Sequence, residues 1–423
     1  MRFRINFTVI CLLATLAMSV GMAAQQTAGQ NLTTPHAALD GGTQTDCLQG
    51  LVARPGLPLR LTALAPEILH MFCKPALSRT RAAQVSNAVS RSDDGGKWVT
   101  IDVPGALSTV AVDINQAGTI TGYYSDANYQ FHGFLRRSNG AITTFDVPNS
   151  VYGTSPTTIN DAGEIAGLYY DGNFVGHGFL RSPNGVIATF DAPGSFYQTY
   201  PTDINDVGVI VGIYSDQDFV SHSFLRTRDG SITEFEVPGS IGSYTSGINL
   251  LGVATGHDSH VDRSSLGFLR NPNGSLTTFE VSSEPPIFVF PLAINLKGAV
   301  TGGFIENHPE GQFSIDRGFL RKPDGSIETF DGVPNPLDPC CTSSVAYSIN
   351  LRGEIVGADN DSRGIYHGFL RDKNGSITNL DAPGAGTGVF QGTTALSINH
   401  LGVVTGYYVD ANNNAHGFLW SRR

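Results

Sequence analysis

The chain has 423 residues, of which 50 are Gly, 22 are Pro and only 15% are charged. Gly and Pro interrupt helices and favour turns, so this composition argues against a mainly helical protein, and a hydrophobic fraction of 40% argues against global disorder. The formal net charge of −11 would repel phosphate backbones and argues against a nucleic-acid partner.

The first 24 residues have the three-part form of a secretory signal peptide. Arg2 and Arg4 precede an apolar run over residues 7–20, and Ala23 and Ala24 supply the small residues of a cleavage site. The run is too short for a membrane span, and no later stretch is apolar enough for one. We therefore predict export to a secreted or periplasmic location without a membrane span; the alternative is a buried N-terminal helix.

Residues 25–96 are predicted to form an N-terminal extension. Residues 25–43 are polar and rich in Gly and Thr, a composition that favours flexibility. The extension contains a single candidate helix, around residues 66–72, and residues 90–96 are typical of a linker.

Four cysteines remain after the leader, and an even number in an oxidising compartment favours disulfides. The local pairing, Cys47–Cys73, is the predicted one, and it leaves Cys340 and Cys341 as a vicinal pair or two free thiols. The alternative pairing links the N-terminal extension to Cys340 or Cys341. Disulfides are predicted here in preference to a zinc site.

A motif Ile-Asn-x-x-Gly recurs seven times at intervals of 44 to 55 residues, at Asn115, Asn160, Asn205, Asn249, Asn295, Asn350 and Asn399. A second motif, Phe-Leu after a small residue, follows 19 residues after the Asn in six of the seven copies. Its Phe residues are Phe134, Phe179, Phe224, Phe268, Phe319, Phe369 and Phe418. Two motifs in constant phase indicate internal repetition of one structural unit.

The second copy shows what this unit is. Apolar runs cover residues 155–160, 164–170, 175–181 and 186–191, and short turn sequences separate them. Asn184-Gly185 is a strong hairpin signal, because both residues tolerate positive φ. The unit is therefore predicted to be four short antiparallel strands, which favours a β-propeller blade over a coil of a β-solenoid.

The two ends of the repeat predict how the ring closes. The last copy supplies only three strands, whereas residues 98–103 match the fourth strand of the other copies. Pairing this N-terminal strand into the last blade would remove two exposed sheet edges. Residues 97–423 are therefore predicted to form an all-β, seven-bladed β-propeller of four-stranded antiparallel blades.

Over residues 97–423 the chain resembles the HAF family of extracellular repeats. The resemblance rests on Ile-Asn-x-x-Gly together with His-Gly-Phe-Leu, which begins at His132, His177, His367 and His416. The third copy has His222-Ser223-Phe224, and the fourth and fifth have Leu266 and Arg317 in place of the His. This chain departs from the family pattern in having Gly or Ser where the family has Ala, and Asp-x-Pro-Gly at the strand ends. The resemblance implies export and a repeat fold, and it brings no activity, cofactor or catalytic residue.

Binding is assigned to the loops between second and third strands and to the connections between blades, which should share the face opposite the tight turns. A Tyr close to an acid recurs there, and this pair suits carbohydrate, whose C–H faces stack on rings and whose hydroxyls need acceptors. Repetition suits avidity for a polymer. The candidate ligand-binding residues are Tyr124, Asp126, Tyr170, Asp171, Tyr214, Asp216, Tyr408 and Asp410. The alternative is that the acids only make turns and the rings only cap the core.

Two further patterns, the repeated His and the loop after Asp410, could indicate a metal site. The repeated His is expected to form a structural pair with the acid after the fourth strand, as His177 with Asp191, rather than to bind a metal. Asp410-x-Asn412-x-Asn414 resembles part of a calcium loop but lacks the Gly and the terminal Glu expected there. No cofactor or metal is therefore predicted, and calcium is the alternative that this loop leaves open.

Asp113 and Asp203 should line the central channel, where paired carboxylates could act on a glycosidic bond. No Gly-x-Ser-x-Gly or His-Glu-x-x-His motif is present, and no catalytic residue is assigned. We predict a monomeric, non-catalytic binding scaffold for an extracellular polymer, such as a carbohydrate, or for a protein. The alternative is a polysaccharide hydrolase or lyase with its site in the channel.

Overall fold

The computed structural model describes residues 89–91, 95–261, 264–282, 288–307, 314–332 and 343–422, all within one compact unit of residues 84–423. The predicted leader, the candidate helix and the cysteines Cys47, Cys73, Cys340 and Cys341 lie outside the described residues. Strands and turns account for the regular structure of the described part, and no helix in it is long and apolar enough to cross a membrane.

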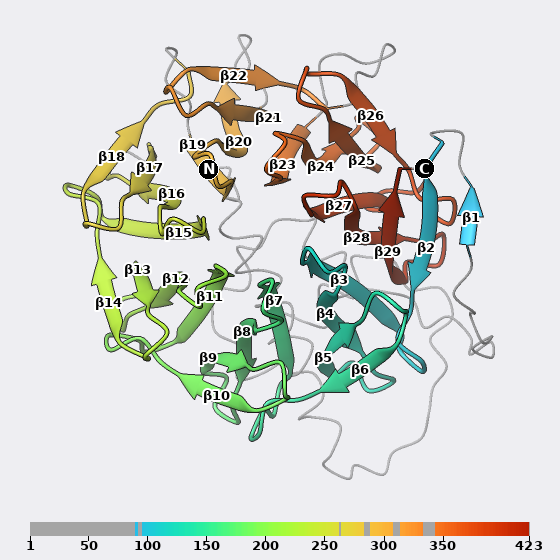
Figure 1. Ribbon diagram of the computed structural model, residues 1–423, viewed down its shortest axis with the longest axis horizontal. Helices are drawn as coiled ribbons and strands as arrows, with labels where there is room; N and C mark the ends of the chain where they lie inside the picture. Colours follow the sequence, from blue (N-terminus) through green and yellow to red (C-terminus); the bar gives the residue numbers. More distant parts are fainter. Residues whose placement is uncertain are drawn as a thin grey trace, which may run out of the picture. The chain divides into compact units, whose positions relative to one another are not determined.

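Seven four-stranded antiparallel blades follow one another around a ring, as Figure 1 shows. Blade 1 consists of β3 (Ser108–Ile114), β4 (Ile120–Ser125), β5 (Phe131–Arg136) and β6 (Ile142–Phe145). Blade 2 consists of β7 (Thr154–Ile159), β8 (Ile165–Tyr170), β9 (Gly176–Arg181) and β10 (Ile187–Phe190). Blade 3 consists of β11 (Gln198–Ile204), β12 (Ile210–Ser215), β13 (Ser221–Arg226) and β14 (Ile232–Phe235).

The other four blades repeat this order. Blade 4 consists of β15 (Gly242–Ile248), β16 (Ala254–Ser259), β17 (Gly267–Arg270) and β18 (Leu276–Phe279). Blade 5 consists of β19 (Phe288–Ile294), β20 (Val300–Asn307), β21 (Ser314–Arg321) and β22 (Ile327–Phe330). Blade 6 consists of β23 (Ser343–Ile349), β24 (Ile355–Asn360), β25 (Tyr366–Arg371) and β26 (Ile377–Leu380). Blade 7 consists of β27 (Gly392–Ile398), β28 (Val404–Val409), β29 (Ala415–Ser421) and β2 (Lys97–Ile101).

Blade 7 confirms the predicted closure of the ring. Strand β2 pairs antiparallel with β29, with Trp98 opposite Trp420 and Ile101 opposite Gly417. A short strand that the sequence did not indicate, β1 (Val89–Arg91), pairs with the outer edge of β2. The expected linker is therefore partly a fifth strand, which covers the edge that β2 would otherwise expose.

The core lies in the seams between blades. The seven Phe residues of the Phe-Leu motif are at most 1% exposed. In five seams, the Phe of the fourth strand of one blade lies between two residues of the following blade. These two residues are the Phe of that following blade's Phe-Leu motif and the Arg at the end of its third strand. Phe145 illustrates this, because it packs edge-on against Phe179 with 6.2 Å between ring centroids, and Arg181 lies 4.8 Å above it. This cation–π contact, which recurs four more times, explains the Arg of the third strand.

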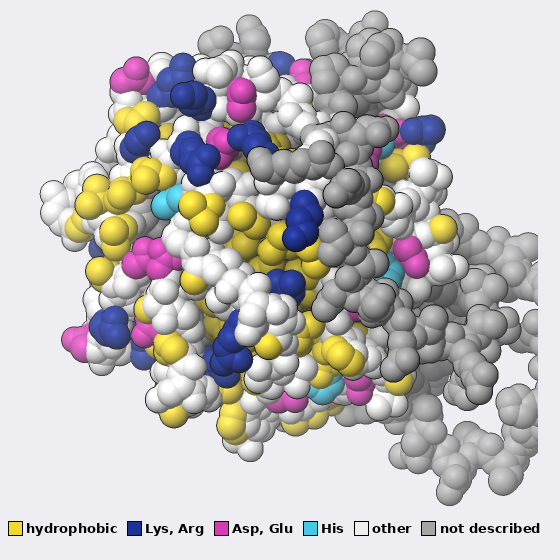
Figure 2. Space-filling model, turned by 45° about the vertical axis from the view of Figure 1, so that its right-hand side comes forward, with side chains coloured by type: hydrophobic (Ala, Val, Ile, Leu, Met, Phe, Trp, Pro, Cys, Tyr) yellow, Lys and Arg dark blue, Asp and Glu magenta, His cyan; other side chains and the backbone are white. Residues whose placement is uncertain are grey.

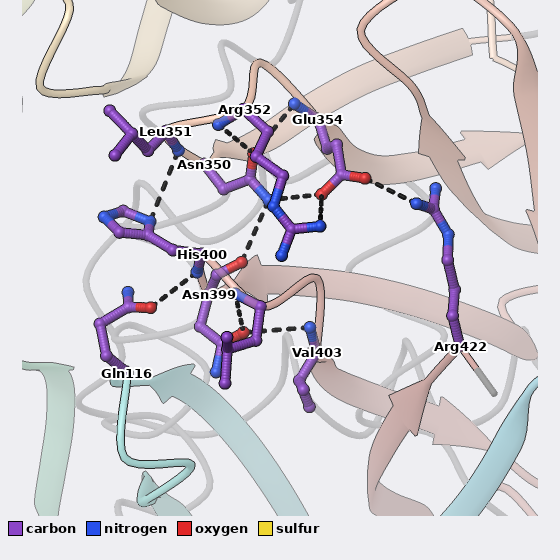
Figure 3. A network of polar contacts seen from close by, with 10 residues as sticks. Gln116, Asn350, Leu351, Arg352, Glu354, Asn399, His400, Val403 and Arg422 are labelled. Atoms are coloured by element: carbon purple, nitrogen blue, oxygen red, sulfur yellow. Dashed lines mark hydrogen bonds and ion pairs between the residues drawn. The ribbon is translucent and has the colours of Figure 1, made fainter.

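The repeated Asn forms a ring of hydrogen bonds around the axis. Each Asn donates from Nδ2 to the backbone carbonyl of the Asn in the next blade, at 3.0 to 3.2 Å, and Asn399 donates to Asn115 to complete the circle. Its Oδ1 accepts a backbone N–H of its own turn, as from Glu164 to Asn160 at 2.9 Å. Figure 3 shows this network around Asn350 and Asn399. One side chain thus fixes both its own turn and the neighbouring blade, which explains the motif.

Candidate functional site

Two faces of the propeller differ in kind. We call the face with the Asn-x-x-Gly turns and the third-to-fourth-strand hairpins the turn face. The loop face carries the loops between second and third strands and the connections between blades, because strand direction alternates within each blade. The eight predicted ligand-binding residues all belong to strand ends or loops near the loop face.

The predicted acids cap their own loops. Asp126 Oδ1 accepts the backbone N–H groups of Asn128 and Gln130, at 2.8 and 2.9 Å. The same two bonds form at Asp171, Asp216 and Asp410, and also at Asp361, which the sequence analysis did not select. Desolvation acts to raise the pKa of Asp126, Asp171, Asp361 and Asp410, but hydrogen bonds within the loop outweigh it and lower the pKa. At Asp216 the hydrogen bond with His222 lowers the pKa most. The acids therefore have a structural role, and contact with a ligand stays a prediction.

Each motif His lies between two carboxylates. His177 Nδ1 is 2.9 Å from Asp191 after the fourth strand, and Nε2 is 3.7 Å from the loop acid Asp171. This confirms the expected pair of His177 and Asp191. In the strand pairing, Phe190 lies opposite Gly178 and Asp191 follows the end of the strand. We call such an arrangement a His clamp, and it recurs at His132, His222, His367 and His416. In blade 5 the bidentate pair Arg317–Asp331 takes its place.

The predicted tyrosines are not the exposed rings that a ligand surface needs. Tyr214 and Tyr408 are 4% and 8% exposed, and Tyr124 is half-buried. Each stacks on its blade's His, with ring centroids 4.9 to 5.1 Å apart. Tyr170 is also buried, but it does not stand at the equivalent position of its blade. In blade 2 the ring that stacks on His177 belongs to the preceding residue, Tyr169. The burial of these rings favours the alternative that they cap the core, and their contact with a ligand stays a prediction.

Burial also affects the hydroxyl groups of these rings. Desolvation raises the pKa of Tyr124, Tyr169, Tyr214 and Tyr408. The hydroxyl of Tyr408 lies 3.4 Å from that of Thr100 on the closing strand. Alanine at any of these positions would thus test packing rather than ligand contact.

The exposed aromatic residues of the loop face are different ones. Three residues after the capping Asp stand Tyr129, Phe174 and Phe219, in three consecutive blades. Tyr129 and Phe219 are 70% and 67% exposed, whereas Phe174 is half-buried. All three have positive φ, 61° to 62°. The sequence carries a signal for them that was not among the predicted site residues: an aromatic residue three positions after the loop Asp.

Rings from the blade connections support two of these residues. Tyr152 stacks on Phe174 with centroids 3.8 Å apart, and Tyr197 stacks on Phe219 at 4.0 Å. Phe196, 58% exposed, packs edge-on against Tyr197. Together with the exposed Leu107, Val151 and Ile241 they give the loop face of blades 1 to 4 an apolar arc.

Charge is divided between the two faces. Among the described Lys and Arg side chains, only Arg317 and Arg363 lie on the loop face, and each is paired with an Asp there. The clamp and capping acids lie on the same face, which is therefore acidic. Lys and Arg side chains surround a hydrophobic area on the side of the molecule drawn in Figure 2.

The channel acids Asp113 and Asp203 do come together. Thr158 Oγ1 lies 3.2 Å from Asp113 Oδ2 and 3.1 Å from Asp203 Oδ1. Each carboxylate also accepts the N–H after it and an N–H of the next blade, from Ile159 at 2.8 Å and from Ile248 at 2.8 Å. Ser397 donates to Asp113 as well, at 2.7 Å. The two acids thus link the first strands of neighbouring blades.

The two channel acids differ electrostatically. Desolvation, with repulsion from Asp113, raises the pKa of Asp203 to about 7, although the N–H groups of Ile248 and Ile204 act in the opposite direction. One hydroxyl proton of Thr158 cannot serve both carboxylates at once. A proton on Asp203 would relieve that conflict, because the protonated carboxyl group could itself donate a hydrogen bond.

The described residues contain no group of three or more His, Cys, Asp or Glu that could hold a metal ion. In the Asp410 loop, the carboxylate accepts backbone N–H groups of Asn412 and Asn414, both at 2.8 Å. A calcium ion is bound by oxygen ligands, and here the Asp410 carboxylate already accepts two backbone N–H groups.

Raising the pH above about 6.5 is expected to lower the free energy of unfolding through the His clamps. Hydrogen bonds to Asp102 and Asp381 raise the pKa of His416 and His367. A group with a raised folded-state pKa stabilises fully below its unfolded value, and this contribution is lost as the pH rises through the folded value. Because both side chains are partly exposed, we expect a loss of a few tenths to about 1 kcal/mol for each of these two His residues.

Urea unfolding of the wild type and of His416→Arg between pH 6 and 9 measures this loss. The Arg variant copies the pair found in blade 5 and should depend less on pH. Comparing the two chains cancels the contribution of Asp203, which is lost over a lower range, up to about 7. Identical pH dependence of the two chains would contradict the assignment.

Comparison with known proteins supports the fold. No family model matches the chain, and no curated protein matches it. The β-propeller domain of the trilobed protease from Pyrococcus furiosus, described as having an open velcro topology, is 13% identical, with 75% of this chain and 95% of that chain covered and a TM-score of 0.52. Virginiamycin B lyase from Staphylococcus aureus is 14% identical, with 77% and 99% covered and a TM-score of 0.49. At such identities a likeness concerns architecture alone: this chain is similar to the trilobed protease domain in being a β-propeller.

Proposed function

We propose that this β-propeller is a non-catalytic binding scaffold that is exported and holds a polymeric partner on its loop face. The observation that carries the proposal is the loop face itself. Capping acids and His clamps fix loops of one conformation in successive blades, and these loops present exposed apolar side chains over an acidic surface. A rigid, repeated surface suits many weak contacts with a repetitive partner.

Export and the relation to the HAF extracellular repeats are part of the proposal. They rest on the N-terminal leader pattern and on the motif copies from residue 97 onward. A monomer is likewise proposed, because the closing strand leaves the ring without an unpaired blade edge at β29.

One observation favours a second candidate, a polysaccharide hydrolase or lyase acting in the channel. Asp203, with its pKa raised to about 7, lies close to Asp113, as acid–base chemistry would require. One observation argues against this enzyme. The carboxylate oxygens of Asp113 and Asp203 already accept hydrogen bonds from N–H groups and hydroxyls of neighbouring blades, which hold the blades together.

A native gel containing single soluble polysaccharides tests the proposal, with the size of each polymer measured after incubation. The loop-face variant Ile241→Glu should weaken retardation, whereas Leu401→Glu, a matched variant at an exposed turn-face position, should not. The polymers should keep their length. Shortening that disappears in Asp203→Asn would instead assign the channel enzyme, and a loss of binding confined to Leu401→Glu would place the partner on the turn face.

A further inference from the structure

Tyr129, Phe174 and Phe219 occupy one position of the loop in three consecutive blades, and their backbone conformation is unfavourable for aromatic residues. Blades 6 and 7 have Gly364 and Asn413 there, also at positive φ. Gly and Asn tolerate the left-handed region, whereas the Cβ of other residues comes too close to the following carbonyl oxygen in it. The turn itself would therefore select Gly or Asn, and the three rings need another explanation.

Packing inside the protein does not supply that explanation. Phe174 and Phe219 stack on Tyr152 and Tyr197, and these contacts set the orientation of the rings. Phe219 nevertheless remains 67% exposed, and Tyr129 is 70% exposed in a blade that has Leu107 in place of the supporting Tyr. Tyr129 and Phe219 are thus bulky residues in a strained conformation that remain in water, and Phe174 is half-buried at the same loop position between them. Such residues point to a partner outside the chain.

The surroundings of the rings indicate the chemistry of that partner. Immediately before each ring stands an exposed amide or acid: Asn128, Asn173 and Asp218. A ring that takes the C–H face of a sugar, next to side-chain oxygens and amides that bond hydroxyls, is a suitable carbohydrate platform. The acidic loop face, whose two described cations are already paired, disfavours an anionic polymer.

The three platforms lie in a row. Gly153, next to Tyr152, is so close to blade 1 that a Cβ on it would come within 2.9 Å of the Phe131 side chain, directly after the Tyr129 loop. One seam further, a Cβ on Gly176, which follows the Phe174 loop, would lie 3.0 Å from Gln198, next to Tyr197. The ring of each blade is thus placed beside the loop of the blade before it.

We infer that Tyr129, Phe174 and Phe219 are three successive sugar-binding platforms for a neutral polysaccharide chain that crosses the loop face from blade 1 to blade 3. This inference rests on the proposed function and adds the ligand class and the residues that contact it. Simultaneous use of three platforms would make binding stronger than a single sugar contact allows.

The test uses affinity gels with hydroxyethyl cellulose, laminarin and galactomannan as neutral probes and polygalacturonate as the anionic probe. The full chain should be retarded by at least one neutral probe and not by polygalacturonate. Tyr129→Ala and Phe219→Ala should each weaken that retardation by about three- to tenfold, the effect of one aromatic contact, and the double variant should weaken it more.

Two variants separate binding from folding. Phe219→Gly removes the ring but gives the turn its preferred residue, so it should lose binding without a fall in melting temperature. Val186→Ala, at a turn-face position that is 61% exposed, should leave binding unchanged.

The possible failures are distinct. Retardation by a neutral probe that survives both ring variants would overturn the platforms and leave the scaffold proposal standing. Retardation by polygalacturonate alone would overturn the ligand class. Absence of retardation by every probe, together with failure to bind any other extracellular polymer, would remove the proposed function as well.

Discussion

Trp98→Ala is expected to lower the free energy of unfolding by about 3–5 kcal/mol, the cost of truncating a fully buried large side chain. Trp98 is 2% exposed on the closing strand, and its ring lies 5.0 Å from that of Phe418. It faces Trp420 across the strand pair that joins the two ends of the propeller. Losing this contact weakens the only pairing that holds β2 in blade 7, so the whole ring should become less stable.

Tryptophan fluorescence during urea unfolding measures this effect well, because the two Trp residues of the chain are Trp98 and Trp420. Lys97→Ala, at the exposed start of the same strand, is the control and should change stability by less than about 0.5 kcal/mol. Deletion of residues 97–104 should cause misfolding or association through the open edges. A Trp98→Ala protein with an unchanged midpoint, or a monomeric deletion protein with unchanged thermal unfolding, would contradict closure by β2.

Asn205→Ala is expected to cost about 2–4 kcal/mol, because one side chain satisfies two buried backbone groups. Its Nδ2 donates to the Asn249 carbonyl at 3.1 Å, and its Oδ1 accepts from Val209 N at 2.9 Å. The residue is only 5% exposed, so water cannot readily replace either bond. Thermal and urea unfolding would give the loss.

Asn205→Asp refines the test, since it keeps the acceptor for Val209 and replaces the donor to the next blade with a carboxylate oxygen. It should also destabilise, and more at neutral than at acidic pH. The control is Gln116→Ala, which removes an exposed bond to His400 N and should cost less than about 1 kcal/mol. Equal stability of Asn205→Ala and Gln116→Ala would mean that the Asn ring does not hold the blades.

The architecture was predictable because the length and strand pattern of one repeat limit how successive repeats can pack. Each copy has too few residues to bury both faces of a four-stranded sheet, so copies must stack, and a last copy of three strands requires the strand at residues 97–101. Contacts between copies were less accessible. The sequence shows that Asn recurs, but its acceptor is a backbone carbonyl 44 to 55 residues away, or 284 away at the closure, and no side-chain pattern marks it.

The candidate site was harder to predict for reasons of register and conformation. Adjacent residues of a strand point to opposite faces, so choosing Tyr170 instead of Tyr169 changed which ring was assigned to the repeat. Tyr129, Phe174 and Phe219 were overlooked because an aromatic residue is not expected at positive φ in a turn. The loop acids were found, but their bonds to the following N–H groups depend on the fold of the loop rather than on composition.

Hydrogen exchange on the full chain, with and without the neutral polysaccharide that retards it most, tests the central claim most directly. The account predicts added protection in the loops of residues 126–130, 171–175 and 216–220 and no change in the Asn-x-x-Gly turns. Protection confined to the first strands around Asp113 and Asp203, or to the turn face, would contradict binding on the loop face.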